Sequence, residues 1–176
     1  MKFKILLLLT FITLFSSCET DNTTNIAITE ADLLGTWQVK EQTLKGTITY
    51  TISGITNTVD YDAYAKDISM TLTFNDTPKK VSASGKYTLV ATSSFLGQPI
   101  TEEELVEADT NPAQNPTWAL NGNNLTMSND NNIPQNLIVE SYDGKILRLK
   151  AEIDEPENSN SQDVNIKTTI YFVLEK

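Results

Sequence analysis

Apolar and polar residues alternate one by one through several segments of this 176-residue chain. In residues 68–74, ISMTLTF, every second residue is apolar, and residues 146–153, ILRLKAEI, show the same pattern with charged residues in between. Successive side chains of a β-strand point to opposite faces of a sheet, so this alternation predicts strands with one apolar face. Residues 166–175 show it again. We therefore expect an all-β domain with eight or nine strands between Thr36 and Glu175.

Turn signals and a change of parity give more detail. Residues 121–124, Asn-Gly-Asn-Asn, separate two short apolar segments, and residues 143–144, Asp-Gly, have the composition of a two-residue hairpin turn. The apolar positions are odd in residues 37–39 and even in residues 44–52. One extra residue in a strand reverses its parity and bends it, so we predict a bulge near residues 40–43.

Two short helices are predicted. Thr29 is a good N-cap and Gly35 a natural stop, so one helical turn is expected between them. Residues 101–108 carry a stronger signal, because Thr101 and Glu104 form a capping box next to a hydrophobic staple. Proline-containing segments on both sides mark this helix as part of a long connection. It either covers one end of the domain or crosses its surface.

The first 28 residues differ from the rest. Two lysines, an apolar stretch and two small residues give residues 1–17 the layout of a secretory signal peptide. The apolar stretch is only about half as long as the roughly 20 residues of a membrane-spanning helix. Cys18, the only cysteine, follows at once. We expect a signal peptide at 1–17, a polar tether at 18–28 and one domain at 29–176.

Composition excludes several kinds of chemistry. The chain has 13 basic and 23 acidic residues, and without residues 1–17, which hold two lysines, 11 remain against 23, or −12. Such a charge disfavours nucleic acids and anionic lipid surfaces as partners. The chain has no histidine, the most common side chain in neutral-pH acid–base catalysis, zinc sites and nucleophilic triads. No carboxylate-pair, Ser/Lys or calcium-loop motif is present, so we predict no enzyme, no cofactor and no metal site.

Residues 15–18, Phe-Ser-Ser-Cys, resemble the looser lipobox of Bacteroidota lipoproteins. The resemblance implies that Cys18 becomes the mature N-terminus and carries a diacylglyceryl group on sulfur and an acyl chain, such as palmitate, on its amine. One chain binds a membrane only marginally, whereas two or more anchor stably. Glu19 and Asp21 resemble the export signals of surface-exposed lipoproteins, so an outer-membrane anchor with exposure at the cell surface is implied. The alternatives are a stray cysteine near an ordinary cut site and an intermolecular disulfide.

Residues 34–37, Leu-Gly-Thr-Trp, resemble the first conserved block of lipocalins, and residues 74–87 and 116–125 add further similarity. Over about residues 30–175 the chain resembles the lipocalin-like lipoproteins of Bacteroidota. Consecutive antiparallel strands can avoid exposed edges by closing into a barrel. We therefore expect an eight- to nine-stranded antiparallel up-and-down barrel with one short helix in a long connection.

The resemblance also implies site residues. In lipocalins the tryptophan closes the barrel floor and a basic residue packs across it, which makes Trp37 and Arg148 candidates. Arg148 lies between two leucines, so an outward-facing charge is the other interpretation. The inward faces carry no charge, which favours a small apolar or amphipathic ligand, although the same bulky residues could fill the barrel. The candidate ligand contacts are Tyr50, Met70, Leu72, Phe74 and Tyr87.

A second function is kept open beside ligand binding. A non-catalytic surface or assembly lipoprotein would bind a protein or a glycan through its outer face or through the connection at residues 95–116. An exposed apolar patch near that connection, together with a filled interior, would favour it. In either case the membrane is reached through lipidated Cys18.

Overall fold

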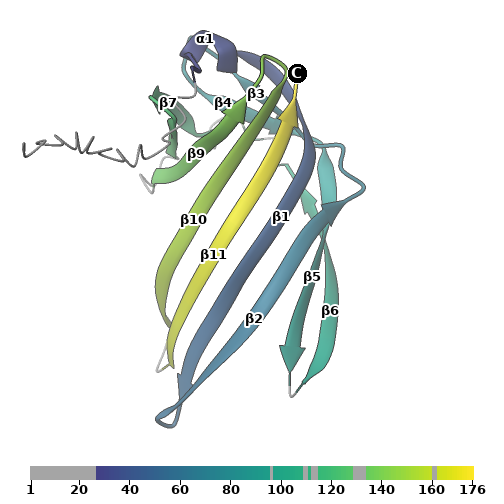
Figure 1. Ribbon diagram of the computed structural model, residues 1–176, viewed down its shortest axis with the longest axis vertical. Coiled ribbons are helices and arrows are strands. Elements are labelled where there is room, and N and C mark those ends of the chain that lie inside the picture. The colour runs from purple at the N-terminus through teal and green to yellow at the C-terminus, as the bar shows by residue number, and fades with distance from the viewer. Residues whose placement is uncertain (1–26, 96, 109–110, 112–114, 129–133, 160–161) are drawn as a thin grey trace, which may run out of the picture.

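The computed structural model describes residues 27–95, 97–108, 111, 115–128, 134–159 and 162–176. One helical turn, α1 (Glu30–Leu33), precedes 11 strands that form a single antiparallel sheet (Figure 1). The strands are β1 (Gly35–Ile52), β2 (Ile55–Lys66), β3 (Thr71–Phe74), β4 (Val81–Ser84), β5 (Lys86–Phe95), β6 (Gln98–Glu107), β7 (Thr117–Asn121), β8 (Asn124–Ser128), β9 (Pro134–Tyr142), β10 (Ile146–Ser159) and β11 (Gln162–Glu175).

The long strand β1 organises the sheet. One of its edges pairs with β11 along most of its length, whereas the other pairs first with β3, through residues 35–38, and then with β2, through residues 43–52. The register with β11 shifts between Val39 and Glu41, which confirms the bulge predicted in this part of the strand. The bulge bends β1 at the point where it changes partner.

The sheet does not close into the barrel that we expected. Its order is β6-β5-β2-β1-β11-β10-β9-β8-β7, with β3 and β4 as a branch on β1. One isolated bridge, between Lys80, the residue before β4, and Thr117, links that branch to β7. Because β1 leaves β3 for β2, the strands β2, β5 and β6 extend away from the short strands (Figure 1). The all-β prediction is confirmed, and the expected number of strands is too low.

The helix predicted over residues 101–108 is wrong, because this segment belongs to strand β6. Ten residue pairs join β6 to β5 in a hairpin whose turn includes Gly97, at φ +76°. A helix of two turns is marginal without tertiary packing, and here Ile100 and Leu105 remain 44% and 56% exposed. The hydroxyls of Thr92 and Thr101 instead pair across the two strands at 3.0 Å. Ladder pairing along the whole segment therefore outweighs the local capping signal.

The other local predictions are confirmed. α1 begins after Thr29, whose backbone N–H donates to the carboxylate of Asp32 at 2.8 Å. Gly35 ends the turn at φ +103°, a backbone conformation that favours glycine. The two predicted hairpins join β7 to β8 and β9 to β10, with Gly122 and Gly144 at positive φ.

Buried apolar side chains form one core beside α1, at the end of the molecule where the short strands gather (Figure 1). Both tryptophans belong to it, Trp37 at 0% and Trp118 at 3% exposure. Alternation along the strands supplies most of the other members. They are Ile28, Leu33, Val39, Met70, Phe74, Val81, Leu125, Leu137, Val139, Leu147, Leu149 and Leu174. Ile28, the last residue of the expected tether, also belongs to this core.

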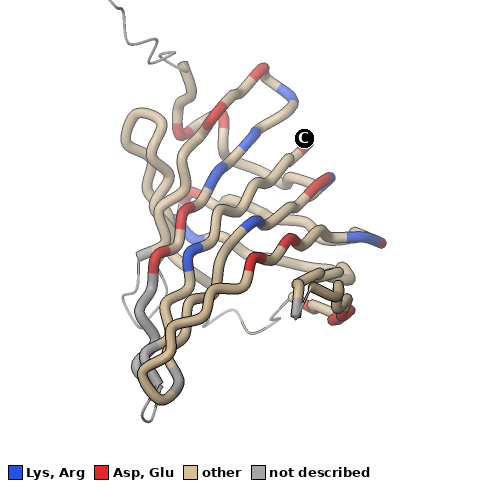
Figure 2. Tube along the Cα trace, turned by 60° about the horizontal axis from the view of Figure 1, so that its bottom comes forward, with Lys and Arg blue, Asp and Glu red and all other residues tan. Residues whose placement is uncertain are grey.

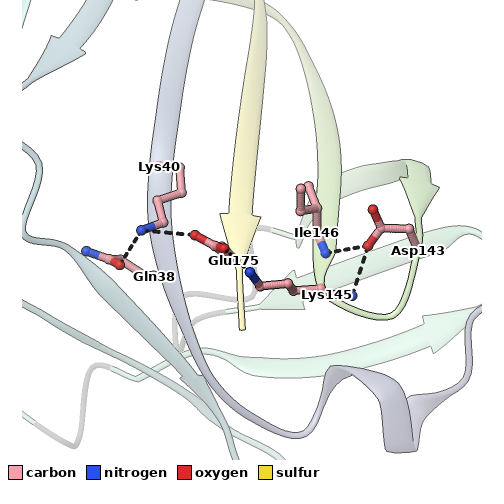
Figure 3. A network of polar contacts seen from close by, with 6 residues as sticks. All are labelled: Gln38, Lys40, Asp143, Lys145, Ile146 and Glu175. Carbon is pink, nitrogen blue, oxygen red and sulfur yellow. Dashed lines mark hydrogen bonds and ion pairs between the residues drawn. The ribbon is translucent and has the colours of Figure 1, made fainter.

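Polar contacts hold the strand ends together at the same end of the molecule (Figure 3). Lys40, at the bulge, and Lys145, in the β9–β10 turn, both form ion pairs with Glu175 of β11, at 3.0 and 2.7 Å. In the turn, the carboxylate of Asp143 accepts hydrogen bonds from the backbone N–H groups of Lys145 and Ile146, at 2.9 and 2.7 Å. These contacts fix the C-terminal strand between its two neighbours.

Candidate functional site

Beyond the core, the long strands continue with one apolar face, which we call the inner face. It is the face on which the core residues Leu147 and Leu174 lie, continued at every second position, and the bulge in β1 keeps that strand in phase with it. Its members are mostly half-buried. They include Leu44, Ile48 and Tyr50 of β1, Val59, Tyr61 and Ala63 of β2, Leu89 and Ala91 of β5, Ala151 and Ile153 of β10, and Ile166, Ile170 and Phe172 of β11.

A cavity of about 320 Å³ opens where the inner face meets the core. Strands β8, β9, β10 and β11 line it. Its apolar lining consists of Met127, Leu137, Ala151, Ile153, Ile170 and Phe172. The small side chain of Ala151 lies between larger neighbours, Leu137 and Ile170, to which it is paired in the sheet. Space for a ligand therefore arises where alternation places an alanine in a row of large residues.

The row of paired residues at the level of Ala151 runs across most of the sheet. Leu137, Ala151 and Ile170 form its first part at the cavity, and Leu44, Ala63 and Ala91 continue it over β1, β2 and β5. All six side chains are apolar, and three are alanine. The apolar row that borders the cavity thus continues across β1, β2 and β5.

One polar contact interrupts the inner face next to this row. The ring of Tyr61 lies against Gly46, and its hydroxyl pairs with the hydroxyl of Thr168, a buried residue at 7% exposure. Gly46 leaves the room for the ring, because a Cβ atom there would approach the ring to 2.8 Å. Thr168 is the register partner of Ile153, which lines the cavity. The Tyr61–Thr168 pair therefore lies beside the cavity along the strands.

Polar residues also line the cavity, and internal contacts occupy Asn136, Glu152 and Asp154 among them. Glu152 forms an ion pair with Lys150 at 2.6 Å, and Asp154 forms one with Lys167 at 3.1 Å. Hydrogen bonding from Asn165 and the nearby Lys167 ammonium lower the pKa of Asp154, which keeps this carboxyl ionised. A general acid would need the opposite shift. The carboxyl of Asp154 is therefore not poised to act as a general acid.

The structure separates the predicted ligand contacts into two groups. Met70 and Phe74 are buried in the core, at 7% and 2% exposure, and Leu72 and Tyr87 pack against it. Tyr50 lies on the inner face, opposite Val164 and Asn57. None of the five lines the cavity. Their ligand role stays a prediction, and sequence reasoning missed the lining of the cavity, because alternation marks inward residues without telling which of them surround a void.

Trp37, the candidate residue for the barrel floor, is fully buried. Its indole N–H donates to the carbonyl oxygen of Leu33 at 2.7 Å, and the ammonium of Lys176 lies 4.9 Å from the centre of its ring. Arg148 is exposed on the face opposite Leu147 and Leu149. The cation over Trp37 is therefore the C-terminal lysine, and Arg148 takes the outward position that strand alternation favours.

In comparisons with protein-family models and with curated proteins, the chain matches none. In the described part of the chain, no helix is long and apolar enough to cross a membrane. The described residues also hold no group of three or more acidic or cysteine side chains placed for a metal ion. The predicted signal peptide and the predicted lipid attachment at Cys18 lie outside the described residues. We therefore argue for a function from the geometry of the cavity and the inner face.

Proposed function

We propose that this protein is a membrane-anchored, lipocalin-like lipoprotein that holds a small apolar or amphipathic molecule on its inner face. The cavity beside Ala151 is the observation that carries the proposal. Its volume of about 320 Å³ falls at the lower end of the range of small-molecule sites, about 300–1,000 Å³. Six apolar side chains line it, and the apolar row across the sheet extends it.

The incomplete filling of the domain supports this function over a purely structural role. The core beside α1 is packed, whereas the inner face beyond it remains half-buried. Burying apolar surface contributes about 25 cal/mol per Å², so a ligand that covers the half-buried side chains gains affinity from contacts that the protein leaves unmade. The bridge between Lys80 and Thr117 brings the β3–β4 branch to β7, which supports a lipocalin-like wall around the core end.

Binding of a neutral apolar dye tests the proposal. N-phenyl-1-naphthylamine fluoresces more strongly in apolar surroundings, and we expect a saturable increase with the purified protein. Ala151→Leu places extra carbon atoms in the cavity and is expected to weaken binding about tenfold or more. Ala119→Leu, the same substitution at an exposed position of β7, is the matched control and leaves binding unchanged. Absence of saturable binding, or equal effects of the two variants, would contradict the proposal.

A second candidate function is binding of a protein or glycan through the outer face. Its support is β6, in which Leu105 is 56% exposed, inside the connection at residues 95–116. The dye experiment separates the two functions. A Leu105→Ser variant keeps full dye binding if the inner face is the site, because Leu105 is at an outer-face position of β6.

A further inference from the structure

Among the described residues, the inner and outer faces of the sheet differ in their charged side chains: unpaired carboxylates lie on the inner face, and basic side chains lie on the outer face. The row of paired residues at the level of Ala151 ends at the exposed edge strand β6, where Glu102 is the register partner of Ala91. Two residues further, Glu104 is the partner of Leu89, so both carboxylates are at inner-face positions. In the described part of the chain, neither has a hydrogen-bond or ion-pair partner, whereas Glu103 between them forms an ion pair with Lys66 at 2.6 Å on the other face.

Basic side chains are confined to the outer face over the same strands. Strand register places every described lysine and arginine of β2, β5, β6, β10 and β11, and of β1 beyond its bulge, at outer-face positions. They are Lys45, Lys66, Lys86, Arg148, Lys150 and Lys167. Figure 2 shows basic and acidic positions intermixed along the strands and separated by uncharged ones. Among the side chains that the structure describes, the cations of these strands thus lie away from the apolar face, and the unpaired carboxylates of Glu102 and Glu104 lie on it, in a chain of net charge −10.

From this complementarity we infer that the occupant of the inner face is a long-chain amphiphile with a cationic head group. This inference rests on the proposed function. Its apolar chain would lie along Ile170, Leu44, Ala63 and Ala91, and its ammonium group would reach Glu102 and Glu104. Four strand spacings separate Ile170 from Glu102, or about 19 Å along the sheet. A small ligand confined to the cavity would not reach the carboxylates, so the head-group preference requires a chain of that reach.

Displacement of N-phenyl-1-naphthylamine by three dodecyl compounds tests the inference. Dodecyltrimethylammonium, dodecanol and dodecyl sulfate share one chain and differ in head-group charge, and all are used below their micelle concentrations. We expect the cation to displace the dye at a concentration about three- to tenfold lower than the neutral compound, as two partly exposed ion pairs allow. The anion is expected to be the weakest of the three. Raising the salt concentration reduces the differences, because it screens exposed charges.

A pair of double variants assigns the preference to the inner face. In the double variant Glu102→Gln with Glu104→Gln, the concentrations at which the cation and the neutral compound displace the dye are expected to differ by no more than about twofold. Glu103→Gln with Glu107→Gln removes the same charge from the outer face of the same strand and leaves the preference intact. Equal loss in both double variants assigns the preference to net charge and overturns the inference. Dye binding without any cation preference overturns it while the proposed function stands, and absence of dye binding overturns both.

Discussion

The two tryptophans provide a sharp test of how the core is stabilised, because their surroundings are closely matched. Each indole N–H donates to a backbone carbonyl, Trp37 to Leu33 at 2.7 Å and Trp118 to Asn75 at 2.9 Å. Each ring has an aromatic edge contact, at 6.2 and 5.7 Å, and a lysine ammonium above it, at 4.9 and 5.1 Å. The clear difference is the acceptor, because Leu33 is fully buried and Asn75 is exposed.

Substitution of each tryptophan by phenylalanine therefore isolates the cost of a buried, unpaired carbonyl. In Trp37→Phe the Leu33 oxygen loses its donor where water cannot replace it, which costs about 1–3 kcal/mol. In Trp118→Phe water can reach the Asn75 oxygen, so only the net value of the hydrogen bond is lost, about 0.5–1.5 kcal/mol. The loss of ring atoms is the same in both and cancels. We expect Trp37→Phe to be less stable than Trp118→Phe by about 1 kcal/mol, or roughly 2–4 °C in Tm.

Urea unfolding followed by far-ultraviolet circular dichroism measures this difference without relying on tryptophan emission. The free energy of unfolding of each variant is compared with that of the unchanged protein at equal slopes m. Equal losses, or a larger loss for Trp118→Phe, would refute the argument that acceptor burial decides the cost.

Two further predictions concern packing and pH. Gly46→Val is expected to destabilise the protein by about 1–3 kcal/mol in urea unfolding, because a Cβ atom there overlaps the Lys167 carbonyl oxygen and the Tyr61 ring. A stability equal to that of the unchanged protein would show that both the ring and the Lys167 carbonyl can shift at no cost, which contradicts this packing argument. Hydrogen bonds from Thr29 lower the pKa of Asp32, and backbone N–H groups lower that of Asp143. The unfolded chain therefore binds more protons in acid, so this part of the stability is complete above about pH 4 and is lost as the pH falls through the folded pKa values. The midpoints of urea unfolding, measured from pH 7 to pH 3, give the loss of stability. In the Asp143→Asn variant, stability is expected to fall less steeply as the pH is lowered.

Much of the local structure follows from the sequence, and particular residues show why. Met70, Leu149 and Leu174 were expected on one face and are buried, because strand geometry alone assigns alternate residues to opposite faces. Gly122 and Gly144 mark hairpin turns, since few other residues adopt their backbone angles without strain. The helical signal at residues 101–108 failed because capping motifs describe a segment in isolation, whereas seven cross-strand pairs with β5 act on residues 101–107 here.

The candidate site was less predictable than the fold. Ala151, Ile153, Ile170 and Phe172 read as inward residues, yet nothing in their order shows that a cavity lies between them and Met127 of β8. A void depends on which strands meet and on the side-chain volumes that face one another. The one hint of the cavity in the sequence is Ala151, a small residue among the large apolar residues that alternate with charged ones in this strand.

By itself, the sequence determined the properties that depend on neighbouring residues: the all-β class, two hairpin turns, the bulge and the inward residues of the strands that it predicted. Only the tertiary structure decided the partners. It pairs β1 with both β3 and β2, which leaves the sheet open, and it places Lys176 rather than Arg148 over Trp37. Lys176 also donates to the carbonyl oxygen of Asp32, 144 residues away in the chain. Alternation repeats over two residues and cannot encode contacts across such separations, which arise when the whole sheet packs.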